Sequence, residues 1–436
     1  MKLWVLALAT FLVAPPFTKA SDLQTVQYPA SKSRGQLQVP AEFHVWIPPG
    51  VIRVKALIVH QHGCGEGAEE SGETAALDLH WRALADKHDA ALLSPHFRAG
   101  TNNCRLWCDP RNGSDASFLR ALTDLGKKTG HPELDSVPWC LWGHSGGGFW
   151  ASLMLEKHPE RIVAIFCRSG SALPAWEKGE IPKPIYPADA YTIPFILNPG
   201  IKERVDARFN SAWEGSLKLF EAFRAKGAPV AFAPDPFSGH DCRNSRLLAI
   251  PFFDACLRER ISPMRERLLV LDTAAGFLGD WQNGSTRSAL GSKNELSWLP
   301  DGVTARAYSE YVKYGVTTDR TPPRKAPVLS SALIDSDLRQ AMVRWTAEAD
   351  LESGIRQFVV YRDGRAIAKV PEKMDDKTGF PQFQSITFHD TPPKDALEMF
   401  YVDKNVSEGE NPSYAVRMIN GVGLESPKSA AVKAIR

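Results

Sequence analysis

The stretch "PWCLWGHSGGGFWASLMLEKHP", residues Pro138 to Pro159, places four glycines around one histidine and one serine. Its first part, Pro138 to Trp142, is a short apolar run typical of a buried strand. Its second part, from Gly147 to His158, has the apolar spacing of a helix. The glycines therefore stand where a strand passes directly into a helix, and Ser145 lies within that turn.

Short apolar runs alternate with helical patterns on both sides of this stretch. Buried strands are predicted at Val54–Gly63, Ala90–Phe97, Pro138–Trp142, Arg161–Gly170, Tyr191–Gly200 and Ala228–Pro236, and helices at Ala75–His88, Asp115–Lys128, Gly147–His158, Asp206–Lys226 and Arg243–Arg258. Continuous apolar strands that alternate with helices predict a mostly parallel sheet covered by helices on both faces. The alternating segment Ala41–Pro48 predicts an antiparallel edge strand.

Length and charge limit the organisation and the partners of the chain. At 436 residues it is too long for one ordinary domain. We expect an α/β domain over residues 21–260, an extension and linker over 261–325, and a last domain over 326–436. The net charge of +2, from 52 basic and 50 acidic residues, gives no indication of a nucleic-acid or membrane-surface partner.

Residues 1–20 have the pattern of a secretory signal. One lysine precedes the apolar run Leu3–Ala14, and a short segment ends in Ala20. No later segment is long and apolar enough to span a bilayer. We expect cleavage after Ala20 and a secreted or periplasmic protein; the alternatives are an uncleaved anchor or a buried N-terminal helix.

The seven cysteines predict some disulfide pairing and at least one unpaired thiol. Cys140 and Cys167 lie in apolar runs and are expected in the core. Pairing among the other five is open: Cys64, Cys104, Cys108, Cys242 and Cys256. No metal site is predicted, because no second Cys or His pair accompanies Cys104 and Cys108 at ligand spacing.

Gly143 to Gly147 fit the pattern G-x-S-x-G between a strand and a helix. A serine on such a sharp turn has a strained backbone and an exposed hydroxyl at the N-terminus of the helix, where negative charge is stabilised. Ser145 is therefore a candidate nucleophile. The alternative is a glycine-rich turn that contains a serine by chance.

A nucleophilic serine needs a base and an acid that orients the base. His240 follows the last predicted strand of the α/β domain, which is where such a base belongs. Glu203 and Asp206 both follow the strand that ends at Gly200, and either could be the acid. We favour Glu203 because it is closer to the end of the strand.

These features resemble the α/β-hydrolase superfamily over Ala41–Arg258, and most of all its secreted esterases, which include polyhydroxybutyrate depolymerase-like, feruloyl and acetylxylan esterases. The stretches "HQHGCG", "DASFLRALTDL" and "HPERIVAIFCRSG" match the layout of that branch. The acid is usually Asp in this superfamily, so Glu203 is a departure. The resemblance implies that the backbone N–H groups of Cys64 and Gly146 form the oxyanion hole.

By this resemblance the chain is a serine esterase that needs no cofactor and acts on an ester substrate, which could be polymeric. Two alternatives stay open: a binding or adhesion protein on a hydrolase-like scaffold, and a serine peptidase of the same fold. Trp176 and Tyr186 lie in a proline-rich segment expected to overhang the site, where they could stack on a substrate ring or simply pack.

The C-terminal third resembles a fibronectin type III sandwich. It follows the linker "TPPRKAP" and contains strand patterns at "QAMVRWTA", "RQFVVYRDGRAIAKV", "SITFHD" and "PSYAVRMINGVGLESP". Asp363-Gly364 predicts a tight hairpin, and Trp345 and Tyr414 are expected in the core. Since no residue here suggests chemistry, we expect a spacer or attachment module that is dispensable for turnover of small esters.

Overall fold

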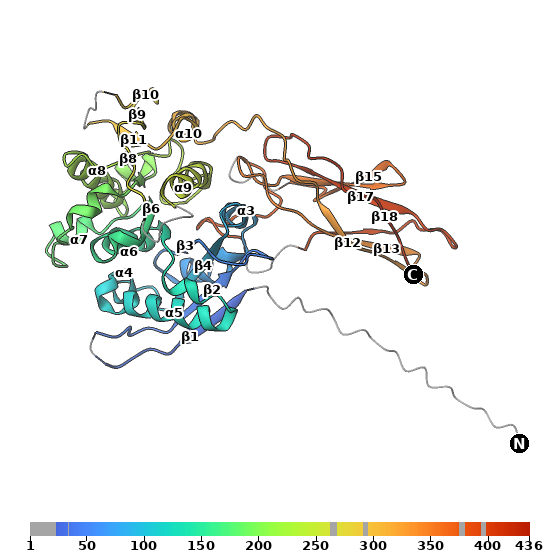
Figure 1. Cartoon of the computed structure of the whole chain (residues 1–436), viewed down its shortest axis with the longest axis horizontal. Helices are drawn as coiled ribbons and strands as arrows, with labels where there is room; N and C mark the ends of the chain where they lie inside the picture. The colour runs from blue at the N-terminus through green and yellow to red at the C-terminus, as the bar shows by residue number, and fades with distance from the viewer. Residues whose placement is uncertain (1–22, 34, 262–267, 291–294, 375–379, 394–397) are drawn as a thin grey trace, which may run out of the picture.

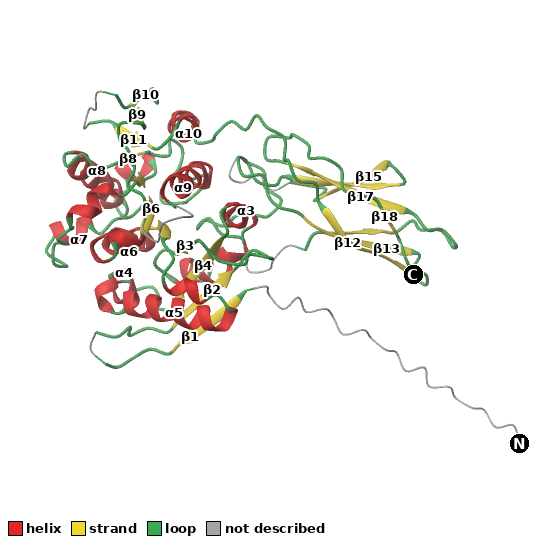
Figure 2. Cartoon of the chain, viewed as in Figure 1, coloured by secondary structure: helices red, strands yellow, loops and turns green. Residues whose placement is uncertain are grey.

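The computed structural model describes residues 23–33, 35–261, 268–290, 295–374, 380–393 and 398–436. The chain forms an N-terminal part that contains all the labelled helices and a C-terminal part built of strands (Figures 1 and 2). The proposed signal segment, residues 1–20, lies outside the described residues. Within the described ranges, no helix has both the length and the apolar character needed to cross a membrane.

The N-terminal domain is built on an eight-stranded sheet with the order β1-β2-β4-β3-β5-β6-β7-β8. The six strands from β4 to β8 in this order are parallel, and β2 and β1 extend the sheet antiparallel. Their bounds are β1 Gln24–Tyr28, β2 Ala41–Trp46, β3 Ala56–Gln61, β4 Ala90–Phe97, β5 Trp139–His144, β6 Ile162–Arg168, β7 Phe195–Asn198 and β8 Val230–Phe232. This confirms the mostly parallel sheet of an α/β-hydrolase fold, although β1 was not predicted.

Helices cover both faces of this sheet, as the sequence predicts. The main helices are α3 Leu79–Lys87, α5 Ser114–Thr129, α6 Gly146–Lys157, α8 Asn210–Arg224 and α9 Arg246–Arg260, with short ones at α1 Glu66–Glu69, α2 Ser71–Thr74, α4 Arg105–Cys108 and α7 Leu173–Glu177. Alternate residues of β3 point to opposite faces: Leu57 joins a core with α5, α6 and α8, whereas Ile58 joins a core with α3 and α9. The sheet is therefore buried on both sides.

Residues 268–314 extend this domain. They form the small sheet β9 Phe277–Gly279, β10 Thr286–Ser288 and β11 Ser297–Leu299, and then α10 Gly302–Tyr314. Tyr308 Oη donates to the Phe232 carbonyl at 2.9 Å, and Tyr311 Oη donates to Asp235 Oδ2 at 3.0 Å. The segment thus packs on the end of the main sheet, beside β8.

The C-terminal domain consists of two antiparallel sheets, of three and four strands. The first has the order β12-β13-β16 and the second β15-β14-β17-β18, with bounds β12 Val328–Asp335, β13 Gln340–Thr346, β14 Gln357–Arg362, β15 Arg365–Val370, β16 Phe400–Asp403, β17 Ser413–Ile419 and β18 Val432–Lys433. Asp363 and Gly364 both have positive φ, +47° and +81°, which confirms the predicted tight hairpin. Membership of the fibronectin type III class remains a prediction.

One predicted strand of this domain is wrong. The segment Ser385–Asp390, "SITFHD", contains no strand; its last three residues form a turn and a bend. Its β-branched and aromatic residues suggested a sheet partner, but the Phe388 carbonyl accepts a hydrogen bond from Cys242 N of the N-terminal domain at 2.9 Å. The segment therefore bonds to the other domain and not to a neighbouring strand.

The two domains are docked through α3, which lies between them in Figure 1. His80 Nε2 donates to the Leu351 carbonyl at 3.0 Å, and Leu79 N donates to Gln384 Oε1 at 2.9 Å. Gln384 Nε2 in turn donates to the Leu77 carbonyl at 3.1 Å. These part-buried contacts join the two domains directly, and the role of the C-terminal domain as a spacer or attachment module stays a prediction.

Candidate active site

Ser145 occupies the turn between β5 and α6 in a strained conformation, with φ +54° and ψ −111°. The turn is so tight that a Cβ on Gly143 would lie 2.3 Å from the Gly147 carbonyl. A Cβ on Gly147 would lie 2.4 Å from the Gln61 carbonyl oxygen. Backbone fills both positions, so both residues of the motif must be glycine if Ser145 is to be presented at the end of the sheet.

The structure brings Ser145, His240 and Glu203 together in one line of contacts. Ser145 Oγ lies 2.9 Å from His240 Nε2, and His240 Nδ1 lies 2.6 Å from Glu203 Oε1. Glu203 is fully buried, and its second carboxylate oxygen accepts the Gly200 N–H at 3.1 Å. The carboxylate is thus held at both oxygens, with Oε1 facing His240 Nδ1 and Oε2 facing the Gly200 N–H.

Asp206, the alternative acid, is placed differently. Its side chain is exposed, and Oδ1 accepts the backbone N–H groups of Arg208 at 2.8 Å and Phe209 at 3.1 Å. A carboxylate in this position stabilises the free N–H groups before α8. Asp206 therefore has a structural role at the start of that helix, and Glu203 is the acid beside His240.

Phe209 is a residue of the site that sequence reasoning missed. Its ring stacks on the His240 ring with centroids 3.8 Å apart and planes 9° from parallel. The aromatic face covers one side of the imidazole and limits its rotation. The only sequence signal for it is its closeness to the candidate acids, because an aromatic residue before a helix is ordinarily a packing residue.

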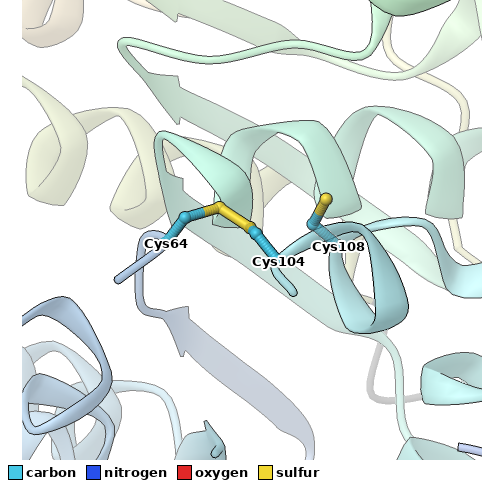
Figure 3. A group of neighbouring side chains, drawn as sticks. All are labelled: Cys64, Cys104 and Cys108. Carbon is cyan, nitrogen blue, oxygen red and sulfur yellow. A yellow bond between two sulfur atoms is a disulfide. The ribbon is translucent and has the colours of Figure 1, made fainter. Parts of the chain in front are cut away.

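The two residues expected to donate the oxyanion N–H groups, Cys64 and Gly146, line the same cavity as Ser145 and His240. Gly146 begins α6, so its N–H has no acceptor within the helix. Cys64 forms a disulfide with Cys104, and a Cβ on Gly146 would lie 2.2 Å from Cys64 Sγ (Figure 3). The disulfide thus packs directly on the start of α6.

His62 supports the segment Gly63–Gly65, which we call the oxyanion loop. Its Nδ1 donates to the Gly63 carbonyl at 2.6 Å, and its Nε2 accepts the Phe97 N–H at 2.9 Å. Complete burial lowers the pKa of His62 to about 3, which keeps the ring neutral and both bonds intact at ordinary pH. No pattern in the sequence predicts this role of His62.

Two groups of side chains have the spacing of metal ligands among the described residues. The first is Cys64, Cys104 and Cys108, but the disulfide takes two of the three sulfurs, and burial raises the pKa of the Cys108 thiol to about 12. The second is Glu42, His44 and His96 on β2 and β4. Here Arg98 already forms an ion pair with Glu42 at 2.5 Å, and a cation in that place disfavours a second one.

The cavity above Ser145 has a volume of about 430 Å³ and a mixed lining. Phe149 and Phe209 contribute apolar surface, while the polar and charged side chains are Asn102, Arg105, Ser169, Ser171, Lys178, Glu180 and Ser211. Trp176, expected to bind substrate, is not among the lining residues. It packs edge-on against Tyr186, with ring centroids 6.3 Å apart, and Pro174, Ala175 and Lys178 line the cavity on this side.

Comparisons with known proteins give only distant likenesses. No family model matches the chain, and no curated protein matches it. Among solved structures it is similar to a ferulic acid esterase, at 18% identity over 50% of this chain and 92% of that one, with a TM-score of 0.36. It is also similar to an S-formylglutathione hydrolase from Agrobacterium tumefaciens, at 17% identity over 54% and 94% of the two chains, with a TM-score of 0.36. A lipase in its open form shares 14% identity over 54% and 98%, also with a TM-score of 0.36.

Proposed function

We propose that this protein is a serine hydrolase of carboxylic esters in which Ser145 is the nucleophile, His240 the general base and Glu203 the orienting acid. The observation that carries the proposal is the unbroken path from Ser145 Oγ to His240 at 2.9 Å and from His240 to Glu203 at 2.6 Å. The Glu203 carboxylate accepts from Nδ1, which leaves Nε2 of the neutral ring free to take the serine proton.

In the proposed reaction Ser145 Oγ attacks the ester carbonyl carbon while His240 Nε2 takes its proton. The tetrahedral intermediate collapses to an acyl-enzyme, and the same proton passes to the leaving alcohol. A water molecule then gives its proton to His240 and attacks the acyl carbon, which releases the acid and restores Ser145. Glu203 stabilises the imidazolium that forms in both halves of the cycle.

The N–H groups of Cys64 and Gly146 are the proposed donors to the oxyanion. Both residues border the cavity next to Ser145, and Gly146 adds the positive end of the α6 dipole. Donors that are fixed before the substrate arrives stabilise the developing charge without reorganisation, which is worth about 10²–10³-fold in turnover for each donor.

The cavity suits an ester with both apolar and polar parts. Phe149 and Phe209 offer apolar and aromatic contact, and Asn102 and Lys178 offer polar contact. We propose polysaccharide-linked or polyester substrates as candidates, to be separated by a panel of feruloyl, acetyl and hydroxybutyrate esters. A serine peptidase and a non-catalytic binding protein are the alternative outcomes of the same panel.

A serine-directed fluorophosphonate tests the proposal directly. It should label wild-type protein at Ser145, and Ser145→Ala should abolish both labelling and esterase turnover, the latter by about 10⁶-fold. Ser211→Ala is the matched control, because Ser211 lines the same cavity and this variant should still be labelled. Undiminished esterase activity in Ser145→Ala would overturn the assignment.

We also propose that residues 1–20 are a cleaved signal and that the mature protein is secreted or periplasmic. The Cys64–Cys104 disulfide supports this, because such bonds persist mainly in oxidising compartments. Sequencing the N-terminus of exported protein should find Ser21 as its first residue. An intact Met1 would contradict the proposal.

A further inference from the structure

A segment of the C-terminal domain, Phe388–Asp390, contacts the N-terminal domain at the loop that carries His240, with Phe388 half exposed and Asp390 inserted. Asp390 is fully buried there and has a positive φ of +63°. The residues around it bond to two separate parts of the N-terminal domain: Thr74 Oγ1 donates to the Pro392 carbonyl at 2.7 Å, and Cys242 N donates to the Phe388 carbonyl at 2.9 Å. We call Phe388–Asp390 the inserted segment.

Asp390 anchors this segment in a buried ion cluster. Arg246 Nε lies 2.6 Å from Asp390 Oδ1, and Trp81 Nε1 donates to Asp390 Oδ2 at 2.9 Å. Arg246 also pairs with Asp78 at 2.8 Å and donates to the Asp390 carbonyl at 2.9 Å. A buried charge is tolerated only with such partners, so the segment has one well-defined position. Arg246 begins α9, which follows directly on the loop that carries His240.

That loop, Ser238–Cys242, which we call the histidine loop, has no regular secondary structure, and side chains from outside it hold its backbone. Arg168, fully buried at the end of β6, donates to the Gly239 carbonyl at 3.0 Å and to the Asp241 carbonyl at 3.1 Å. His144 Nε2 lies 2.7 Å from the carbonyl of His240 itself. Three consecutive carbonyls on and beside the proposed base are thus fixed by two buried side chains.

The inserted segment is joined to this arrangement through two histidines. The His240 carbonyl can only accept, so His144 Nε2 carries the proton of that bond. Burial lowers the pKa of His144 well below its ordinary value, so the ring is neutral and its Nδ1 has no proton. His389 Nδ1, 3.1 Å from His144 Nδ1, must then be the donor. The two hydrogen bonds are therefore donated in the same direction: His389 donates to His144, and His144 donates to the backbone carbonyl of His240.

We infer that the C-terminal domain positions the proposed base, with His389 and His144 as positioning residues that act on His240 through this hydrogen-bonded chain. The inference rests on the proposed function of His240. The inserted segment bonds directly to the histidine loop at Cys242 and indirectly through His144, and none of its three residues lines the cavity above Ser145. Its loss should therefore affect the chemical step and leave substrate binding largely intact.

The test compares His389→Leu with His389→Asn in the full chain. Leu has no donor for His144 Nδ1, whereas the Asn side-chain amide can place an N–H near the position of the imidazole Nδ1. We expect kcat to fall about 10- to 100-fold in His389→Leu, since a displacement of about 1 Å at the reacting groups can cost 10²-fold, with KM changed less than twofold. His389→Asn should recover most of kcat.

Tyr414→Phe is the matched control for general destabilisation of the C-terminal domain. It removes the buried hydrogen bond that Tyr414 Oη, in the core of the C-terminal domain, donates to Asp403 at 2.7 Å. This variant should lower the melting temperature without lowering kcat. Equal kcat in His389→Leu and wild type, or a loss of kcat in Tyr414→Phe as large as in His389→Leu, would overturn the inference.

A second measurement needs no variant that could fail to fold. In wild-type protein with ¹⁵N-labelled histidine, NMR should find His144 protonated at Nε2 and His389 protonated at Nδ1. The opposite tautomer of His144 would overturn the inference. Fluorophosphonate labelling of the same wild-type sample separates this result from the proposed function: failure to label Ser145 refutes the esterase proposal, whereas normal labelling with unchanged kcat in His389→Leu refutes only the positioning role.

Discussion

The two loops that complete the site are held in opposite ways. The oxyanion loop, Gly63–Gly65, is fixed by the Cys64–Cys104 disulfide and by His62, both within the N-terminal domain. The histidine loop, Ser238–Cys242, is fixed by non-covalent bonds, and one group of these comes from the inserted segment of the C-terminal domain. The oxyanion loop should therefore respond to reduction, whereas the histidine loop should respond to whatever disturbs domain docking.

This difference is the reason to expect that the C-terminal domain does more than serve as an attachment. Irregular backbone near the core must find partners for its N–H and carbonyl groups. The histidine loop lies between β8 and α9 and takes those partners from Arg168, His144 and Phe388. Because Phe388 belongs to the C-terminal domain, we expect a chain that ends near Thr321 to lose part of the support of its proposed base.

The largest effect expected on the side of the histidine loop separates the two candidate acids for His240. Glu203→Gln leaves His240 without a carboxylate on Nδ1, and turnover should fall by up to about 10⁴-fold because the ring can adopt the wrong tautomer. Asp206→Asn should cost no more than about 1 kcal/mol of stability and little turnover, because Asp206 is exposed and only stabilises the start of α8. Both variants are compared on one soluble ester after a check of folding by circular dichroism.

The reverse ranking of these two variants would show that the contact between His240 and Glu203 is not the catalytic one. Near-normal turnover in Glu203→Gln alone would also contradict the proposed triad, since nothing else described near His240 Nδ1 provides a carboxylate at 2.6 Å. The pair of variants therefore tests whether Glu203 orients His240 of the histidine loop.

Much of the fold and the centre of the site could be predicted because their signals are local. The strand, turn and helix that present Ser145 lie within Pro138–Pro159, and the six parallel strands appear as separate apolar runs. Glu203 was favoured over Asp206 from its distance to the end of β7 alone. These features depend on residues that are neighbours in the sequence.

The supports of the histidine loop could not be predicted, because their partners are far apart in the chain. His144 and His389 are separated by 245 residues, and Arg168 and Asp241 by 73. Periodicity shows that a segment is apolar but not what it packs against, so it predicts a strand at "SITFHD" and leaves Trp176 open between a substrate contact and packing. Arg168 looked like an ordinary strand end, although its guanidinium is fully buried.

A smaller effect is expected at the oxyanion loop. Cys104→Ser removes the disulfide but keeps the Cys64 backbone N–H, so the donor is present but less firmly held. We expect kcat to fall by at most about 10²-fold, the lower value for loss of one oxyanion donor, with KM little changed. Cys108→Ser is the control, since Cys108 is a free, buried thiol beside the bond (Figure 3). Equal loss in the two variants would mean that packing near α4, not the disulfide, holds the loop.

The last effect concerns stability as a function of pH and singles out the inserted segment. Burial, with the nearby His240 and His60, lowers the pKa of His389 from 6.5 to about 4. Between these values the unfolded chain takes up a proton that the folded chain excludes, so the free energy of unfolding falls as the pH falls. For this one ring the slope is about 1.4 kcal/mol per pH unit, and above pH 6.5 it contributes nothing.

His389→Asn has no ring to protonate, so its free energy of unfolding should rise relative to wild type as the pH is lowered from 6.5 to 4. Urea unfolding at half-unit steps measures the difference between the two proteins, in which the contributions of titrating groups distant from His389 cancel. Tyr414→Phe, which loses no group that titrates in this window, should stay parallel to wild type. Parallel curves for His389→Asn and wild type would mean that His389 is already open to water in the folded protein, and that the inserted segment is not docked beneath the histidine loop in solution.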